Sequence, residues 1–160
     1  MKKNKGFTLV ELMMVMVVMA IIATLATGAA MKSIKQSKEK RIDATCVALK
    51  MALTNYRAAE QKWPTRLEQA NDTDETVVFT DENNKFVFGP LLADRSKSYL
   101  DPSALLTKVK GNVMPLRKAM EENAGKSDFP IGYSDPANGN IFKFFKVTFN
   151  LSLDTVSVGR

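Results

Sequence analysis

A single carboxylate, that of Glu11, stands at the edge of the most apolar stretch of this chain. The twenty residues from Leu12 to Met31 that follow it carry no charge. A carboxylate in the middle of a bilayer costs up to about 3 kcal/mol on insertion scales. The chemistry open to Glu11 is to accept a cation or a hydrogen-bond donor, so we expect it to have a partner or a function.

Other residue types that carry chemistry are scarce. The 160 residues include no histidine and one cysteine, Cys46, which excludes Ser-His-Asp and Cys-His catalysis and an intrachain disulfide. No Gly-rich phosphate loop, zinc cluster or pair of catalytic carboxylates stands out. The sequence therefore predicts that the protein is not an enzyme and needs no cofactor.

The element that positions Glu11 is long enough to cross a bilayer. A helix of twenty residues rises about 30 Å, which matches the hydrocarbon core. One interpretation is a cleaved secretory signal peptide, but the apolar run is too long for it. A second is a plain signal anchor that tethers a periplasmic or extracellular domain. Both leave Glu11 unexplained, and a third interpretation depends on the residues just before it.

The string KGFTLVEL, from Lys5 to Leu12, resembles the prepilin signature of type IV pilins and type II secretion pseudopilins. In that signature a short basic leader ends in a glycine and is removed by a peptidase. The mature chain then begins with an aromatic residue and has a glutamate at its fifth position. The similarity extends from Lys5 to about Leu25. It is one of the more specific short motifs that a sequence can carry.

The resemblance implies a role for each of three residues. A prepilin peptidase would cut between Gly6 and Phe7 and would N-methylate the new amino terminus of Phe7. Glycine suits a cut site because a missing side chain lets a protease approach the backbone closely. Glu11 would pair with the Phe7 ammonium of a neighbouring subunit during assembly. The other partners implied are copies of this chain, other pilin-like subunits and the bacterial inner membrane.

The predicted domains follow from this resemblance and from the pattern of apolar residues. Residues 1–6 are a cleaved leader, and 7–31 are the transmembrane half of a long N-terminal helix. Residues 32–59 are its amphipathic half, and 60–160 form a globular α+β head. No proline interrupts the helix before the Trp63-Pro64 pair, which ends it. The amphipathic half carries an apolar stripe at three- and four-residue spacing that packs on the head (Ile42, Cys46, Leu49, Leu53 and Tyr56).

Two positions in the helix allow more than one interpretation. Gly28 stands where many relatives have a helix-breaking proline. It is either a point where the helix loosens in a filament or a small residue for close packing. Cys46 is expected to be a small packing residue rather than a reactive thiol.

The head is expected to combine two hairpins and two short helices. One hairpin pairs Thr76–Thr80 with Lys85–Phe88, and a helix follows the Asp101-Pro102 cap and stops at Gly111. A second short helix runs from Pro115 to Asn123 and ends at Gly125. After Phe145 apolar residues alternate, and the parity changes near Leu151–Asp154, which predicts a turn and a terminal hairpin. The fold class is therefore α+β, pilin-like, with a long N-terminal helix packed on a small antiparallel sheet.

Oxygen-bearing side chains gather before the last strands (Asp128, Asp135, Asn138 and Asn140). Such ligands would suit Ca²⁺, but their spacing matches no calcium motif. Asp135-Pro136 and Asn138-Gly139 are typical of turns. We therefore expect plain loops here rather than a metal site.

The charges bear on orientation and on partners. Lys2, Lys3 and Lys5 favour a cytoplasmic amino terminus and a periplasmic head, but the cations that follow the apolar segment favour the reverse (Lys32, Lys35, Lys38, Lys40 and Arg41). The resemblance supports the first orientation. Without Lys2, Lys3 and Lys5 the net charge of +6 falls to +3, which is too weak to predict nucleic-acid binding.

Two function classes stay open. The favoured one is a structural subunit of a type IV pilus-like or type II secretion pseudopilus filament, first in the inner membrane and then in a periplasmic or cell-surface filament. The lone cysteine and the aromatic-Pro-Thr connection at Trp63 lean toward the pseudopilin side. The alternative is a membrane-anchored periplasmic or extracellular binding domain whose signal anchor is not processed.

Overall fold

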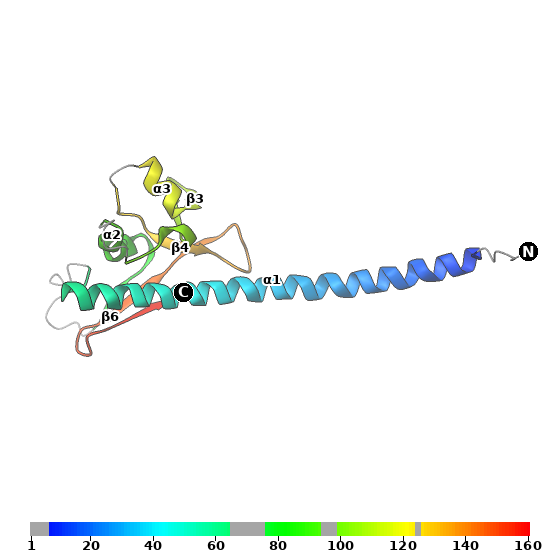
Figure 1. Cartoon of the computed structure of the whole chain (residues 1–160), viewed down its shortest axis with the longest axis horizontal. Helices are drawn as coiled ribbons and strands as arrows, with labels where there is room; N and C mark the ends of the chain where they lie inside the picture. Colours follow the sequence, from blue (N-terminus) through cyan, green and yellow to red (C-terminus); the bar gives the residue numbers. More distant parts are fainter. Residues whose placement is uncertain (1–6, 65–75, 94–98, 124–125) are drawn as a thin grey trace, which may run out of the picture. The chain divides into compact units, whose positions relative to one another are not determined.

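The computed structural model describes residues 7–64, 76–93, 99–123 and 126–160. The chain divides into two units (Figure 1). The N-terminal unit ends at Glu39, and the C-terminal unit comprises Lys40–Arg160.

Helix α1 runs from Leu9 to Glu60 as one element of 52 residues. Long unbranched apolar side chains and the absence of proline favour this length. The helix continues through Gly28, where an added Cβ would meet nothing within 4 Å. The predicted helix over 7–59 therefore agrees with the structure to within two residues at its start and one at its end.

The helix ends just before the aromatic-Pro connection. Gln61 takes a left-handed backbone with φ of 56°. Its N–H donates to the Arg57 carbonyl at 2.9 Å, and its side-chain amide donates to the Ala58 carbonyl at 2.9 Å. A left-handed residue that closes the last turn is a common way to end a helix. The Trp63-Pro64 pair predicts that the helix ends near this point. In the structure it ends at Glu60, followed by the left-handed backbone of Gln61.

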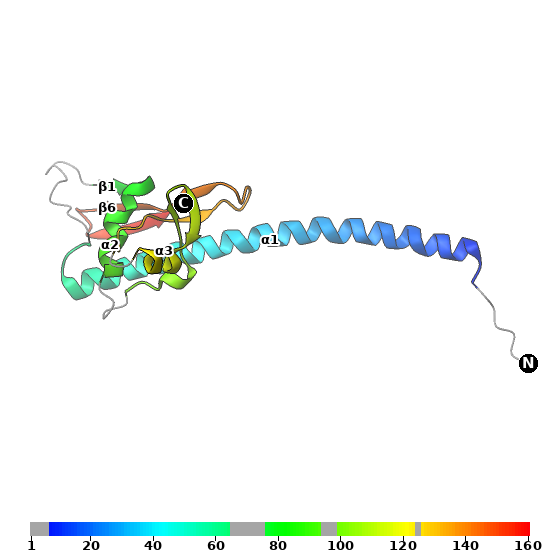
Figure 2. The same cartoon turned by 90° about the horizontal axis from the view of Figure 1, so that it is seen from above.

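In the C-terminal unit, one face of α1 supplies part of the hydrophobic core. Ile42, Leu49, Ala52 and Leu53 are buried there, and Cys46 and Tyr56 pack against the same core. The predicted apolar stripe is thereby confirmed. Figures 1 and 2 show the other elements of this unit gathered around the second half of α1.

Cys46 belongs to this stripe and is half-buried. Burial raises the pKa of its thiol, with a smaller contribution in the same direction from the Asp43 carboxylate. A raised pKa lowers the thiolate fraction and with it the reactivity. The thiol therefore acts as a packing group, as predicted.

Among the described residues, the first strand of the head and its last two strands form a three-stranded antiparallel sheet. Strand β1 (Thr76–Phe79) pairs with β6 (Lys146–Asn150), which pairs with β7 (Thr155–Gly159). The predicted terminal hairpin is confirmed, with its turn over residues 151–154. Val147 and Phe149 face the core, whereas Leu151 and Leu153 are exposed in the turn.

The predicted hairpin of Thr76–Thr80 with Lys85–Phe88 is wrong. After β1 the chain enters a 3-10 turn, η2 (Asp81–Asn84), and then helix α2 (Lys85–Ala93). A short apolar run cannot by itself distinguish a buried helix from a strand. Here the helix buries both Val87 and Phe88, whereas a strand would place such neighbours on opposite faces.

The stretch after Asp101 also departs from the prediction. Asp101 does cap a turn, because its carboxylate accepts the Ser103 N–H at 2.9 Å, but that turn is the short 3-10 helix η4 (Pro102–Ala104). The chain then forms strands β2 (Leu106–Val109) and β3 (Asn112–Pro115). Gly111, with φ of 87°, makes the tight turn between them rather than ending a helix.

These strands belong to a second sheet that the sequence did not predict. Its order is β3-β2-β4-β5, with β4 at Ile131–Ser134 and β5 at Phe142–Phe144. Helix α3 (Leu116–Glu122) follows β3 and confirms the predicted second short helix. Gly125, its predicted end, lies outside the described residues. The protein is thus α+β, with a long N-terminal helix packed on antiparallel sheets rather than on one.

Asn84 is the polar residue that ties this arrangement together. It is fully buried at the end of η2. Its amide nitrogen donates to the Ile131 carbonyl at 2.7 Å and to the Phe145 carbonyl at 2.9 Å, and its oxygen accepts the Ile131 N–H at 3.0 Å. One side chain therefore bonds three backbone groups, of which the Ile131 carbonyl also accepts the Phe145 N–H at 3.1 Å, whereas the Ile131 N–H and the Phe145 carbonyl depend on Asn84.

We predict that Asn84→Ala destabilises the head strongly. Each buried group left unpaired costs about 1–3 kcal/mol, so the free energy of unfolding should fall by about 3 kcal/mol. Denaturant unfolding of the full chain, followed by the fluorescence of its single tryptophan, measures this value. The neighbouring exposed Asn83→Ala is the matched control and should change it by less than about 0.5 kcal/mol. Equal losses in the two variants would contradict the role given to Asn84.

Candidate functional site

Glu11, which the sequence identifies as a candidate site residue, is hydrogen-bonded to Thr8 at the first turn of α1. The Thr8 carbonyl accepts the Leu12 N–H at 3.2 Å, which makes Thr8 the N-cap of the helix. Its hydroxyl accepts the Glu11 N–H at 3.3 Å. In return the Glu11 carboxylate accepts the Thr8 N–H at 2.8 Å and the Thr8 hydroxyl at 3.0 Å. Thr8 and Glu11 therefore form a capping box.

This box gives Glu11 a local role besides the predicted one. It satisfies backbone N–H groups that the first turn of a helix leaves without partners, and a negative charge there is favourable to the helix dipole. The sequence does carry the signature, a threonine followed three residues later by a glutamate. The prediction gives Glu11 only an intermolecular partner, so Thr8 is a site residue that it missed.

The two oxygens of Glu11 are used differently. Both bonds from Thr8 end on Oε2. Oε1 can therefore accept a further donor without loss of the cap. The carboxylate as a whole is exposed, so a partner from outside the chain can reach it.

The processing residues lie directly before the cap. Phe7 precedes Thr8 and is 84% exposed. The structure places Phe7 just before α1 and four residues before Glu11, whereas Gly6 and the bond that joins it to Phe7 lie outside the described residues. Hydrolysis of that bond would release an amino group within one residue of the capping box.

The helix surface after Glu11 is apolar and exposed. From Leu12 to Ile22 every large apolar side chain of α1 is 46–70% exposed. No helix in the described part of the chain meets the criteria of length and apolarity for crossing a membrane.

The oxygen-rich loop before β5 shows turn contacts. The Asp135 carboxylate accepts the Ala137 N–H at 2.9 Å and lies 2.7 Å from the Lys143 ammonium, which lowers the pKa of that carboxyl. Asn138 accepts the Asn140 N–H at 3.2 Å. Among the described residues, no group of three or more acidic or cysteine side chains is placed to hold a metal ion. The turn chemistry predicted for Asp135 and Asn138 is confirmed.

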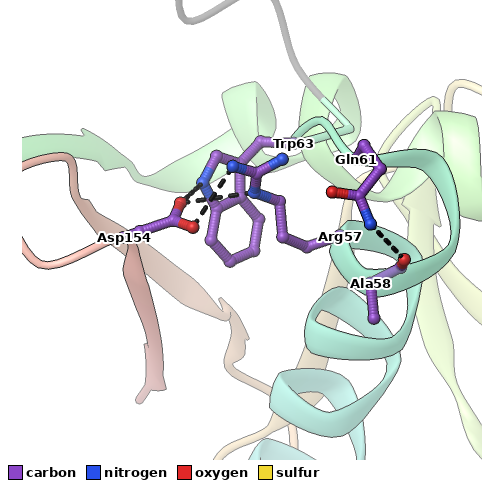
Figure 3. A network of polar contacts seen from close by, with 5 residues as sticks. All are labelled: Arg57, Ala58, Gln61, Trp63 and Asp154. Atoms are coloured by element: carbon purple, nitrogen blue, oxygen red, sulfur yellow. Dashed lines mark hydrogen bonds and ion pairs between the residues drawn. The ribbon is translucent and has the colours of Figure 1, made fainter.

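A second polar cluster joins the end of α1 to the β6–β7 turn (Figure 3). The Arg57 guanidinium donates twice to the Asp154 carboxylate, at 3.3 and 3.2 Å, and the Trp63 indole N–H donates to it at 2.9 Å. The guanidinium also lies over the Trp63 ring, 5.8 Å from its centroid. The hydrogen bond from Arg57 lowers the pKa of the Asp154 carboxyl, and the bond from Trp63 adds to this.

Trp63 is also a packing residue, as predicted. Its ring meets Phe149 edge-to-face, 5.0 Å between centroids. Nothing in the sequence near Asp154 indicates its role, because its partners lie 97 and 91 residues away. The cluster fastens the last turn of α1 to the terminal hairpin and has no reactive group of its own.

Comparisons with known proteins bear on the first of these clusters. Residues 1–27 match the protein family described as the prokaryotic N-terminal methylation motif. This motif is the hallmark of type IV prepilins and pseudopilins, so the resemblance predicted from KGFTLVEL is confirmed. Neither the search of curated proteins nor the search of solved structures found a match to the chain.

The Asp154 cluster generates a prediction on pH. Because the pKa of Asp154 is lower in the folded state, the ionised carboxylate stabilises the fold at pH values above its unfolded pKa of about 4. That contribution is lost as the pH falls through the folded pKa. Asparagine tolerates the left-handed backbone of residue 154 (φ 48°) and can still accept from Trp63, so Asp154→Asn isolates the charge.

The free energy of unfolding of wild type and Asp154→Asn should therefore differ at pH 7 and converge toward pH 3. Denaturant titrations at several pH values measure the difference. A difference that stays constant over this range would show that the Asp154 charge has no part in the cluster.

Proposed function

The chain carries the N-terminal methylation motif of the type IV prepilin and pseudopilin family, and we propose that it is a structural subunit of a type IV pilus-like or type II secretion pseudopilus filament. A prepilin peptidase cuts it between Gly6 and Phe7 and methylates the new amino terminus. The subunit then assembles through helix α1 with copies of itself and other pilin-like subunits. Its activity is assembly rather than catalysis, and it needs no cofactor and no nucleic acid.

Before assembly, the motif implies a membrane-anchored protein of the pilin type. We propose that the apolar segment Leu12–Met31 resides in the bacterial inner membrane as a single span, with the leader in the cytoplasm and the head in the periplasm. Assembly moves the segment from lipid into a bundle of helices in a periplasmic or cell-surface filament. Both environments cover the exposed apolar side chains of this segment.

The observation that carries the proposal is Glu11 with its half-occupied carboxylate. Thr8 engages Oε2, and Oε1 is left to accept the Phe7 ammonium of a neighbouring subunit. Two unit charges about 4 Å apart attract by roughly 1 kcal/mol in water and roughly 4 kcal/mol at an effective dielectric of 20. Because the apolar helices around the pair exclude water, its attraction energy lies closer to the higher of these two values. The pair also removes the cost of an unpartnered carboxylate, so it sets the register between subunits.

Processing is tested by the intact mass of the chain after co-expression with a prepilin peptidase. We expect loss of residues 1–6 and one added methyl group on Phe7. Gly6→Val should block the cut, because a branched side chain hinders approach to the backbone. An uncut, unmethylated wild-type chain would remove the proposal and favour a membrane-anchored binding domain with a non-processed signal anchor.

Two substitutions at Glu11 separate its local role from its role between subunits. Glutamine can still form a capping box but carries no charge, whereas alanine can do neither. We expect both variants to be cut normally and both to fail in filament assembly, measured by the yield of sheared filaments and by electron microscopy. Normal filaments from Glu11→Gln would show that the cap, and not the ion pair, is what assembly requires.

A further inference from the structure

Five cations follow the uncharged segment of α1 within ten residues. All five are exposed, and we call them the cation collar (Lys32, Lys35, Lys38, Lys40 and Arg41). Residues 32–41 also hold one acid, Glu39, so their net charge is five minus one, or +4. In the described part of the chain the cations that form ion pairs lie elsewhere in the sequence. The collar can therefore meet anions from outside the chain.

The collar surrounds the helix instead of following one side of it. Successive residues of an α-helix are about 100° apart when they are viewed along its axis. Counted from Lys32, the directions are about 80° for Lys40 and about 180° for Arg41. They are about 240° for Lys38 and about 300° for Lys35. A site for one protein partner needs its cations on one side of the helix, whereas a ring of cations suits a medium that surrounds it.

The collar begins where the uncharged segment ends. Lys32 and Lys35 lie about 1.5 and 6 Å beyond Met31 along the helix axis. Arg41, the last cation of the collar, lies about 15 Å beyond it. If the segment spans a bilayer, the headgroup layer covers about the next 5–8 Å of the helix. Long cationic side chains bend back toward such a layer, and its field extends about 8 Å further at physiological salt, so all five cations are within its reach.

From this placement we propose that the cation collar binds the headgroups of anionic phospholipids, in the leaflet from which residues 32–41 emerge. Lysine ammonium groups and the arginine guanidinium donate charge-assisted hydrogen bonds to the phosphate oxygens of such lipids. Lipids approach a helix from every side, which matches a ring of cations. The inference rests on the proposed function, because that function places Leu12–Met31 in the membrane as a span.

Headgroup binding by the collar also fixes how deep the helix sits in the bilayer. Lys32 follows Glu11 by 21 residues, which is about 31 Å along a helix. This length matches the hydrocarbon core of about 30 Å, so both charges reach the two edges of the core at one depth only. A collar held by headgroups therefore keeps the Glu11 carboxylate out of the hydrocarbon. It also gives a use to cations that the orientation proposed for the chain leaves unexplained.

The lipid selectivity of the full chain in vesicles tests the collar. The protein is reconstituted in phosphatidylcholine vesicles that contain a trace of spin-labelled phosphatidylglycerol or of spin-labelled phosphatidylcholine. Electron paramagnetic resonance measures the fraction of each labelled lipid that lies next to the protein, and the ratio of the two fractions is the preference for the anionic lipid. The leader cations Lys2, Lys3 and Lys5 are present in every variant, so a difference between variants reports the collar alone.

The collar variant has glutamine at all five collar positions, which keeps the helix because glutamine is a good helix former. The matched control has glutamine at five exposed lysines of the head, so its net charge falls by the same amount (Lys62, Lys108, Lys110, Lys126 and Lys146). We expect the preference for phosphatidylglycerol to fall about fivefold in the collar variant, the factor that one cation near an anionic surface contributes, and to stay unchanged in the control. High salt should abolish the preference of the wild type.

A milder variant keeps the test decisive if the fivefold change prevents reconstitution. Lys32→Gln with Lys35→Gln removes the two cations nearest the apolar segment, and the preference should again fall, by at least about twofold. An unchanged preference in this variant would overturn the collar, as would an equal fall in the collar variant and in the head control.

The outcomes keep this inference separate from the proposed function. If the chain inserts and is cut and methylated, but the wild type does not prefer phosphatidylglycerol, the function stands and the collar does not bind lipid. An acidic protein surface is then the partner that its charge favours. If a prepilin peptidase does not cut the chain, but the preference depends on the collar, the proposed function fails and this inference stands.

Discussion

The absence of charge between Glu11 and Lys32 is the constraint on which the rest of this structure depends. A helix with such a surface is unstable in water, because its exposed apolar area must find cover. In the function that we propose, lipid covers this area before assembly and other helices cover it afterwards. The carboxylate of Glu11 would then be compatible with a dry helix bundle only where a cation meets it, so its charge would set the register that apolar packing alone leaves free.

The head is built to support this helix without a disulfide. Its core includes one face of α1, where Ile42, Leu49 and Leu53 are buried. Two sets of polar contacts join segments that are distant in sequence. Asn84 connects η2 to Ile131 in β4 and to Phe145, and Asp154 connects the β6–β7 turn to Arg57 in α1. The buried set has satisfied partners and supports stability, whereas the exposed one depends on pH and salt. Near the middle of α1, Arg160 at the chain end pairs with Asp43.

Prediction from sequence succeeded where a local pattern determines the element. The long helix followed from apolar spacing and the lack of proline, and the terminal hairpin followed from the parity change near Leu151. It failed at Lys85–Phe88, because a run of only three apolar residues fits a strand or a buried helix equally well. Asn84, in the turn that precedes the helix, donates hydrogen bonds to the carbonyls of Ile131 and Phe145. These carbonyls are far away in sequence, so their effect on the turn is not visible in a local pattern. The second sheet was missed because its strands are four residues or fewer, too short to show a clear alternation of apolar and polar residues.

At the site, the sequence singles out Glu11 by its cost in an apolar segment and Phe7 by resemblance, and the roles given to both stay predictions. It missed Thr8, although the capping signature is visible, because the prediction gave the Glu11 carboxylate only an intermolecular partner. It could not find Asp154, whose partners are about ninety residues away. The structure thus changes Glu11 from a bare charge into one that caps its own helix with one oxygen and has the other available.

The central claim is that the Glu11 carboxylate of one subunit meets the Phe7 amino group of another. Solid-state NMR on mixed filaments tests it directly, with half of the subunits carrying ¹⁵N-labelled phenylalanine and the other half ¹³C-labelled glutamate. A dipolar coupling between the methylated amine nitrogen and a glutamate carboxyl carbon, matching about 4 Å, is the predicted result. In such a sample the coupling can arise only between different chains. Filaments that show no coupling in the mixed sample, but show it when both labels are in the same chain, would contradict the account.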